Sequence, residues 1–201
     1  MRFLPLAAVL LSTALSAQTF TFTARIERAP ANACDPTATH KVACADVLLK
    51  SSVVNLASLE GQRVTMDGTF VLGGCITIDV ATAAAATYRH TVTGSNGFHL
   101  GSNVSFRGTC PFAGFVALAL SGGPGFLPLS TFGAYWLDLP TSLLIGINLG
   151  LLGSQTTVIQ IPPNDLSLIG AVIYSQTAWV DILSTPQTGA FVNSECFTIV
   201  Q

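Results

Sequence analysis

The residues of this chain that could do chemistry are few. Three histidines, His40, His90 and His99, are the candidate general bases. A Ser-His-Asp site needs such a base beside an activated nucleophile. The sequence holds no GxSxG, HExxH, Walker, GxGxxG or CxxC motif that would supply the rest of a known site. We therefore predict that none of the three is catalytic.

A pair of carboxylates could instead hydrolyse a glycosidic bond. After Arg107 the chain has no lysine or arginine, so its acids are conspicuous. Asp138 and Asp181 each follow an aromatic residue, an arrangement found in many sugar sites. Asp165 ends a Pro-Pro-Asn-Asp turn, where an aspartate has a structural use. We expect structural roles for all three, assign no catalytic residue and predict that the protein is not an enzyme.

Four aromatic residues are the best candidates for ligand contact, namely Tyr135, Trp136, Tyr174 and Trp179. Neighbouring residues of a strand point to opposite faces, so either Tyr135 or Trp136 faces outward unless both faces of the sheet are covered. A ring on a flat sheet face can stack on a sugar. Carbohydrate binding is therefore one hypothesis, and packing of the rings in a core is the other.

Five cysteines lie after the N-terminal segment, at Cys34, Cys44, Cys75, Cys110 and Cys196. With His40, the first three could outline a zinc site, but their spacing fits no standard zinc motif. We expect disulfides instead, and no metal or cofactor. An odd number leaves one cysteine free or bonded to another molecule.

The N-terminus has the pattern of a secretory signal peptide. Arg2 precedes an apolar run from Phe3 to Leu11, and small residues follow as far as Ala17. Cleavage is expected after Ala17 or Ser16. The run is too short to span a bilayer, which takes ~20 apolar residues. We therefore expect an exported protein, secreted, periplasmic or at the cell surface, where disulfides persist.

The composition is poor in charge. Charged residues make up 9% of the chain, against ~25% in ordinary soluble proteins, and hydrophobic residues make up 50%. The basic residues between Arg25 and Arg107 are scattered among acids and predict no basic patch. Nucleic-acid binding is therefore not expected. No transmembrane segment is predicted after cleavage, because the apolar run 143–152 is short and holds Asn148. The low charge fits either self-association or a well-buried two-layer core.

Apolar and polar residues alternate with a period of two, which predicts strands. Strands are expected first at 20–27, 63–70 and 76–80, the last two as a hairpin around Gly73-Gly74, with a connector at 81–86. Later strands, which look more buried, are expected at 115–120, 134–139, 143–149, 156–161, 171–183 and 191–200. A cluster of turn residues at 93–97 marks the expected domain boundary. Many short strands between turn signals indicate sandwiches or barrels.

Segments of the chain resemble domains of exported bacterial proteins that have no known activity. The matching pieces are residues 118–125, 161–165, 168–176 and 189–200, which resemble a C-terminal domain of such proteins. Residues 54–64, 68–69 and 74–76 resemble the small OB-type barrel that often precedes it. Where that family usually has a Ser-Asn pair, this chain has Asn193-Ser194-Glu195-Cys196, a departure that could reflect a disulfide special to this protein. The resemblance implies an all-β architecture and no particular activity.

These observations predict an all-β protein with a signal peptide at 1–17, a small OB-like barrel at 18–93 and an antiparallel β-sandwich at 98–201. Cys110 and Cys196 are expected to join an early strand of the sandwich to its last strand. Two of Cys34, Cys44 and Cys75 are expected to pair in the first domain. The expected function is an exported, non-catalytic structural or interaction module with polysaccharide or extracellular protein partners. Carbohydrate binding is the alternative and a secreted hydrolase the third hypothesis.

Overall fold

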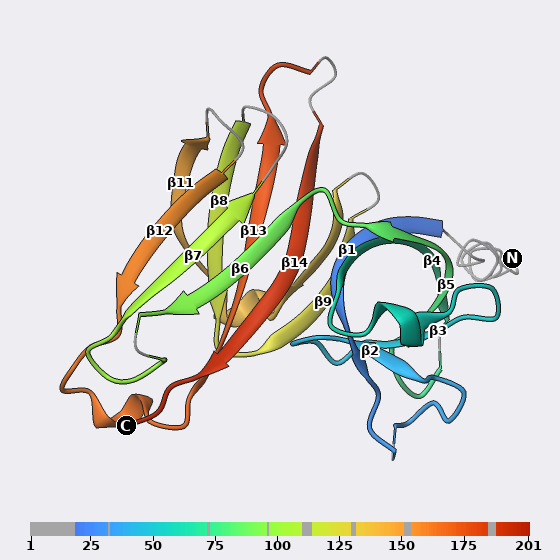
Figure 1. The fold of residues 1–201 in the computed structure, drawn as a ribbon, viewed down its shortest axis with the longest axis horizontal. Coiled ribbons are helices and arrows are strands. Elements are labelled where there is room, and N and C mark those ends of the chain that lie inside the picture. Colours follow the sequence, from blue (N-terminus) through green and yellow to red (C-terminus); the bar gives the residue numbers. More distant parts are fainter. Residues whose placement is uncertain are drawn as a thin grey trace, which may run out of the picture.

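The computed structural model describes residues 19–31, 33–71, 73–95, 97–109, 114–129, 132–150, 154–184 and 188–201. The expected signal peptide and Cys110 lie outside these ranges. Within them the chain forms strands β1 to β14 and three short 3-10 helices. The strands build a closed barrel and a two-layered sandwich (Figure 1). The predicted fold class is confirmed.

Five strands close the barrel in the order β1-β2-β3-β5-β4. They are β1 (Thr19–Arg28), β2 (His40–Val42), β3 (Leu48–Lys50), β4 (Arg63–Val71) and β5 (Thr77–Ala85), with the 3-10 helix η1 (Leu56–Leu59) between β3 and β4. All neighbours are antiparallel except β3 and β5, which are parallel. This is the predicted OB-like barrel.

Alternation along β1 explains the barrel core. Phe20, Phe22, Ala24 and Ile26 are buried inside the barrel, while most of the intervening residues are polar. The expected connector at 81–86 is instead largely strand, because β5 runs on to Ala85 and pairs with β4 there. Strand pairing outweighs the helical propensity of the alanines.

The sandwich contains two antiparallel sheets. One has the order β11-β8-β13-β14 and the other the order β12-β7-β6. The four-stranded sheet contains β8 (Gly114–Ser121), β11 (Leu143–Gly150), β13 (Val172–Asp181) and β14 (Gly189–Thr198). The three-stranded sheet contains β6 (Arg89–Gly94), β7 (Asn103–Thr109) and β12 (Ser154–Gln160), and the helix η3 (Leu166–Leu168) follows β12. Val104, Phe106, Leu118 and Phe197 fill the space between the sheets.

The change from barrel to sandwich comes earlier than the turn cluster at 93–97 suggests. Strand β6, expected in the first domain, pairs with β7 along its whole length, so the sandwich begins at Arg89. The turn cluster joins two strands of one sheet instead of two domains. A cluster of turn residues does not distinguish these cases.

A hairpin from the sandwich half packs on the barrel. It consists of β9 (Pro124–Leu129) and β10 (Gly133–Leu137) and is followed by the 3-10 helix η2 (Leu139–Thr141). The ring of Phe126 stacks on Phe70 with centroids 5.6 Å apart, and Trp136 meets Phe22 edge-on at 5.7 Å. Trp136 Nε1 also donates a hydrogen bond to the carbonyl of Thr23. The hairpin thus completes the barrel core and holds the two halves together.

Two disulfides join distant parts of the described chain. Cys34 is bonded to Cys75, which confirms a pair within the first domain. Cys44 is bonded to Cys196, so the expected Cys110–Cys196 pair is wrong. The reason is the position of β14, which lies beside β1 at the junction and brings Cys196 to the turn between β2 and β3 (Figure 1). Two disulfides fit a location outside the reducing cytoplasm.

Among the described residues, no helix has both the length and the apolar character needed to cross a membrane.

Candidate functional site

The outer side of the four-stranded sheet carries a contiguous apolar surface. Residues paired directly across strands point to the same side of a sheet, so the register places three rows there. The rows are Leu149–Phe115–Val180, Ile147–Ala117–Ala178–Phe191 and Leu144–Ala119–Gln176. We call these ten residues the apolar face. None of them is charged.

Solvent reaches much of the apolar face. Ile147 is 60% exposed and Phe115 is 46% exposed, and Leu144 and Leu149 are exposed as well. This corrects the expectation that the stretches 115–120 and 143–149 form buried strands. Only the inner residues of β8, such as Val116 and Leu118, face the other sheet. Monomeric soluble proteins rarely leave a large contiguous apolar surface open, and such a surface marks a site of interaction.

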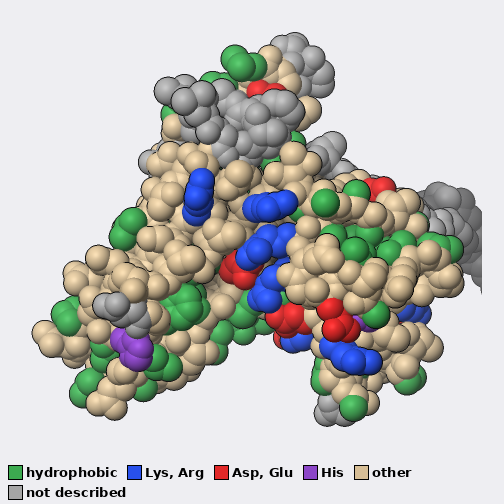
Figure 2. All heavy atoms as spheres, in the orientation of Figure 1, with side chains coloured by type: hydrophobic (Ala, Val, Ile, Leu, Met, Phe, Trp, Pro, Cys, Tyr) green, Lys and Arg blue, Asp and Glu red, His purple; other side chains and the backbone are tan. Residues whose placement is uncertain are grey.

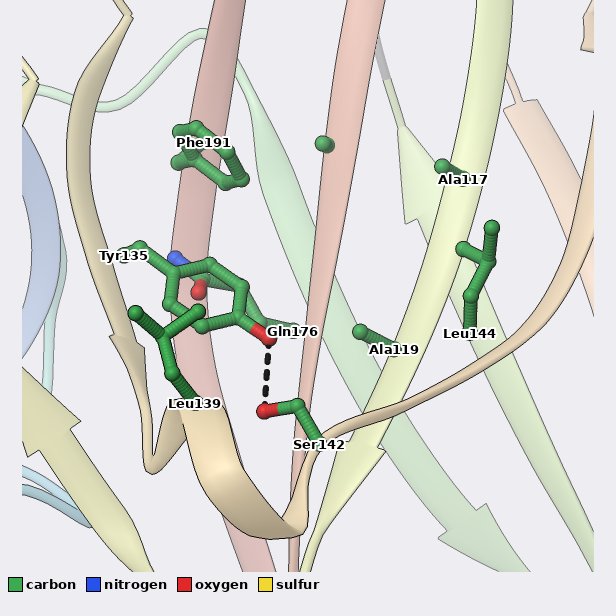
Figure 3. Close-up of a pocket in the computed structure, with 9 residues that line it drawn as sticks. Ala117, Ala119, Tyr135, Leu139, Ser142, Leu144, Gln176 and Phe191 are labelled. Carbon is green, nitrogen blue, oxygen red and sulfur yellow. Dashed lines mark hydrogen bonds between the residues drawn. The ribbon is translucent and has the colours of Figure 1, made fainter.

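A hollow of about 340 Å³ lies in the apolar face, where the segment from β10 to η2 passes beside the sheet (Figure 3). Ala117, Ala119 and Ala178 form its floor on β8 and β13. Its rim consists of Tyr135, Leu139, Ser142, Leu144 and Phe191, with Gln176 beside Tyr135. Because the floor residues are small, an apolar side chain of another molecule can enter.

Hydrogen bonds fix the rim of this hollow. The hydroxyl of Tyr135 donates to Ser142 Oγ at 2.7 Å (Figure 3), and Ser142 in turn donates to the carbonyl of Asp138. Gln176 is buried and ties β10 to the sheet, because its amide donates to the carbonyls of Ala134 and Val192 and accepts from the N–H of Trp136. The polar atoms of the rim are thus engaged within the protein, and the surface offered outward is apolar.

The four aromatic residues expected to contact a ligand do not form one strip. Trp136 is 0% exposed in the barrel core, and Trp179 is 2% exposed beneath Tyr88. Neither indole offers a face to a sugar ring. Tyr174 is half-buried on β13, and Tyr135 packs edge-on against Phe191 on the rim of the hollow. Of the four, Tyr135 alone lines the hollow.

A polar cluster fastens the sandwich to the barrel. Glu195 on β14 accepts two hydrogen bonds from Arg63, at 2.6 and 3.0 Å, and lies 3.4 Å from Arg25 Nε. The Asn193 side chain donates to Glu195 and also exchanges two hydrogen bonds with the backbone of His90. Ser194 donates to the carbonyl of Ala43. Ser194, Glu195 and, through its disulfide, Cys196 thus bind across the junction, while Asn193 ties β14 to β6.

This cluster was not among the sites expected from the sequence, although one signal was available. Glu195 is the one acid of its strand, in the half of the chain that has no cations. A buried carboxylate needs a charged partner, and that partner had to come from the first half. These four residues are also the ones that depart from the Ser-Asn pair of the resembling family.

His90 and Ser175 make a contact that resembles part of a catalytic triad. His90 Nε2 lies 2.8 Å from Ser175 Oγ. Both residues are fully buried between the sheets, where no substrate reaches them. Burial, and then the charge of Arg63, lower the pKa of His90 to about 3. A neutral, enclosed imidazole of this kind serves packing rather than acid–base chemistry.

The other candidate chemical residues make structural contacts. Asp138 accepts from Thr141, Asp165 accepts from the N–H of Ser167, and Asp181 accepts from the N–H groups of Leu183 and Ser184. Each of these acids therefore closes its own turn. His40 lies 3.1 Å from Glu60, and His99 lies 2.6 Å from the carbonyl of Gln201. In the described part of the chain, no three histidine, cysteine or acidic residues are grouped as a metal site.

The arginines, by contrast, form a group in the structure, although they are scattered along the sequence. Arg25 and Arg63 meet at Glu195, and Arg63 and Arg89 line one hollow at the junction. Figure 2 shows basic side chains following one another from the sandwich into the groove beside the barrel, with acidic groups next to them. Residues far apart in sequence make this group, so its spacing along the chain gave no signal.

Comparison of the chain with protein families, with curated proteins and with solved structures finds no match.

Proposed function

We propose that this protein is an exported, non-catalytic structural module that associates with a second copy of itself through the apolar face. The observation that carries the proposal is the exposure of an uncharged apolar surface on neighbouring strands of one sheet. Burial of apolar area is the main favourable term in protein association. The turn-closing acids and the enclosed histidine support a non-catalytic role, and the disulfides support export.

A second copy suits this surface better than a charged partner does. In a twofold interface the same patch of both copies is in contact. Any charge on the patch would therefore lie near the same charge on the second copy and be repelled by it. The ten residues of the apolar face carry no charge. The strip from Leu144 to Leu149 also lies on β11, an edge strand of its sheet, so a second sheet can approach without obstruction from a further strand.

The test compares two exposed β-branched residues on opposite sides of the sandwich. Ile147 on β11 is 60% exposed within the apolar face, and Val158 on β12 is 57% exposed on the other sheet. Size-exclusion chromatography with light scattering would give the mass of the mature protein across a concentration series. All variants would carry Cys110→Ser, which removes chance cross-linking through the fifth cysteine.

We expect a dimer for the parent protein and for Val158→Lys, and a monomer for Ile147→Lys. An ammonium placed in an apolar interface must be desolvated without a partner, which costs several kcal/mol. A parent protein that stays monomeric at the highest concentration would overturn the proposal. So would equal dissociation of both lysine variants.

A further inference from the structure

A second hollow lies at the junction of barrel and sandwich, away from the apolar face. Its volume is about 230 Å³, and its lining consists of Gly61, Gln62, Arg63, Ala85 and Arg89. Arg63 comes from the barrel strand β4 and Arg89 from the sandwich strand β6. The hollow therefore forms only where the barrel and the sandwich meet.

Positive charge exceeds negative charge around this hollow. The carboxylate of Glu195 serves both Arg25 and Arg63, and Arg25 is also paired with Glu27 at 3.1 Å. Arg89 and Arg107 are both exposed, and within the described residues neither forms a salt bridge. Arg107 makes one long contact, from Nη2 to Ser154 Oγ at 3.5 Å. The acids of the junction thus leave this group of arginines under-neutralised.

The arginines also keep hydrogen-bond donors available. Arg63 uses Nε and Nη2 to bind Glu195, and no hydrogen bond from Nη1 is found within the described residues. Arg89 uses Nε for a 3.4 Å contact with the carbonyl of Ala86, which leaves both of its terminal nitrogens. Guanidinium groups with free N–H pairs match the oxygens of carboxylate and sulfate groups.

The sheet that carries Arg89 continues the site as a polar surface. On the outer side of the three-stranded sheet the register places four rows. They are Arg89–Thr109–Ser154, Thr91–Arg107–Thr156, Thr93–Ser105–Val158 and Asn103–Gln160, which we call the polar face. Arg89 and Arg107 are diagonal neighbours there, about 7–8 Å apart on general sheet geometry. Two guanidinium groups this close repel each other, and an anion bound between them would offset that repulsion.

We propose that the junction hollow and the polar face together bind an acidic polysaccharide. Arg63, Arg89 and Arg107 would bind its carboxylate or sulfate groups, and the threonine, serine and amide side chains of the polar face would bind its hydroxyl groups. Hydroxyl-rich side chains favour a sugar polymer over an acidic peptide, which has few hydroxyls to offer. This site uses no aromatic ring and is independent of the apolar face.

The experiment is affinity electrophoresis of the mature protein in gels that contain one polymer each. Polygalacturonate supplies carboxylates and dextran sulfate supplies sulfates, while dextran is the neutral control and polyglutamate and single-stranded DNA are the other acidic polymers. We expect retardation by polygalacturonate, dextran sulfate or both, but not by the other three. Retardation should weaken at 0.5 M NaCl, because salt screens exposed charges.

The variants Arg89→Gln and Arg107→Gln should each weaken this binding at least about tenfold, the usual effect of losing a hydrogen bond to a charged group. Arg28→Gln is the matched control, because Arg28 is an exposed arginine at the C-terminal end of the barrel strand β1. All three side chains are exposed, so their replacement should not unfold the protein. Equal loss in Arg28→Gln would show general charge attraction and overturn the proposal.

Retardation by polyglutamate or DNA as strong as by the acidic polysaccharides would also overturn it, and so would no retardation in any gel. Competition with free sulfate and with galacturonate distinguishes the two anion types. The competitor that restores the mobility of the protein identifies the group that the arginines bind. Dimerisation can be scored on the same samples, so failure of this site is distinguishable from failure of the apolar face.

Discussion

The two outer surfaces of the sandwich are built on the same plan and have opposite chemistry. Strand β7 alternates strictly, with Val104 and Phe106 inward and polar residues outward. Strand β8 is apolar on both sides, with Val116 and Leu118 inward and Phe115 outward. The side chains of the polar face therefore meet water, whereas large side chains of the apolar face, such as Ile147 and Leu144, are left exposed by the described residues.

Because of this difference, the residues that stabilise the fold are distinct from the residues proposed to bind partners. A continuous apolar run normally indicates a strand that is buried on both faces. Here the inner side of β8 is covered by the three-stranded sheet, and the outer side remains for another molecule. The inward residues hold the fold together, and in the two proposals above the outward residues of the two sheets bind partners of different kinds.

The sharpest test of this separation replaces two phenylalanines. Phe106 points inward, is 3% exposed and contacts Phe197, whereas Phe115 is 46% exposed on the apolar face. We expect Phe106→Ala to lower the free energy of unfolding by about 3–5 kcal/mol. Phe115→Ala should lower it by less than about 1 kcal/mol, since much of its ring is already in water.

Denaturant titrations would measure both values, in the Ile147→Lys background so that association contributes nothing. Comparable losses for the two variants would show that the apolar face belongs to the core, and the distinction between the faces would fail.

A second test perturbs the inner layer and leaves both outer faces unchanged. The pKa of His90 is about 3 in the folded protein, against about 6.5 in an unfolded chain. Between these values the unfolded state binds a proton that the folded state does not. Stability is therefore highest well above pH 6.5 and falls as the pH falls, by about 2 kcal/mol between pH 6.5 and 5.

His90→Gln should flatten this part of the stability curve, because glutamine does not titrate. The window from pH 6.5 to 5 is chosen because hydrogen bonds lower the pKa values of Asp35 and Asp67 and move their titration to more acidic pH. An unchanged slope in His90→Gln would mean that another group causes the pH dependence.

Much of the fold was predictable from the period of the sequence. The alternation of Phe20, Phe22 and Ile26 gave β1, and the glycines between 70 and 76 gave the hairpin of β4 and β5. The boundary was not predictable, because β6 belongs to the sheet with which it pairs and not to the segment that precedes it. The prediction of the Cys110–Cys196 disulfide was wrong for the same reason, because Cys196 meets Cys44 only once β14 has packed on the barrel.

The candidate sites were less predictable than the fold. Local sequence identifies a residue type but not which side of a sheet is covered, so Trp136 and Trp179 looked like ligand residues and are buried. The run from Leu143 to Leu149 looked buried, and its side chains are largely exposed. The arginine group combines β4, β6 and β7, and only the folded junction brings these strands together.

The smallest expected effect comes from exchanging single residues between the faces. Leu149→Thr places a hydroxyl on the apolar face, and Thr156→Val places an apolar group on the polar face. Both positions are exposed strand sites, and the new residues keep good strand propensity. Each variant should therefore change the free energy of unfolding of the monomer by about 0.5 kcal/mol or less.

The association of these two variants should nevertheless differ. Leu149→Thr should weaken the dimer measurably. Thr156→Val should not create a new dimer contact through the polar face, because Arg107 lies in the same row and keeps that surface charged. Light scattering and denaturant unfolding of the two proteins give both quantities. If Thr156→Val promoted association as strongly as Leu149→Thr weakened it, one apolar side chain would suffice for docking, and the continuous uncharged surface would not be the feature that the second copy recognises.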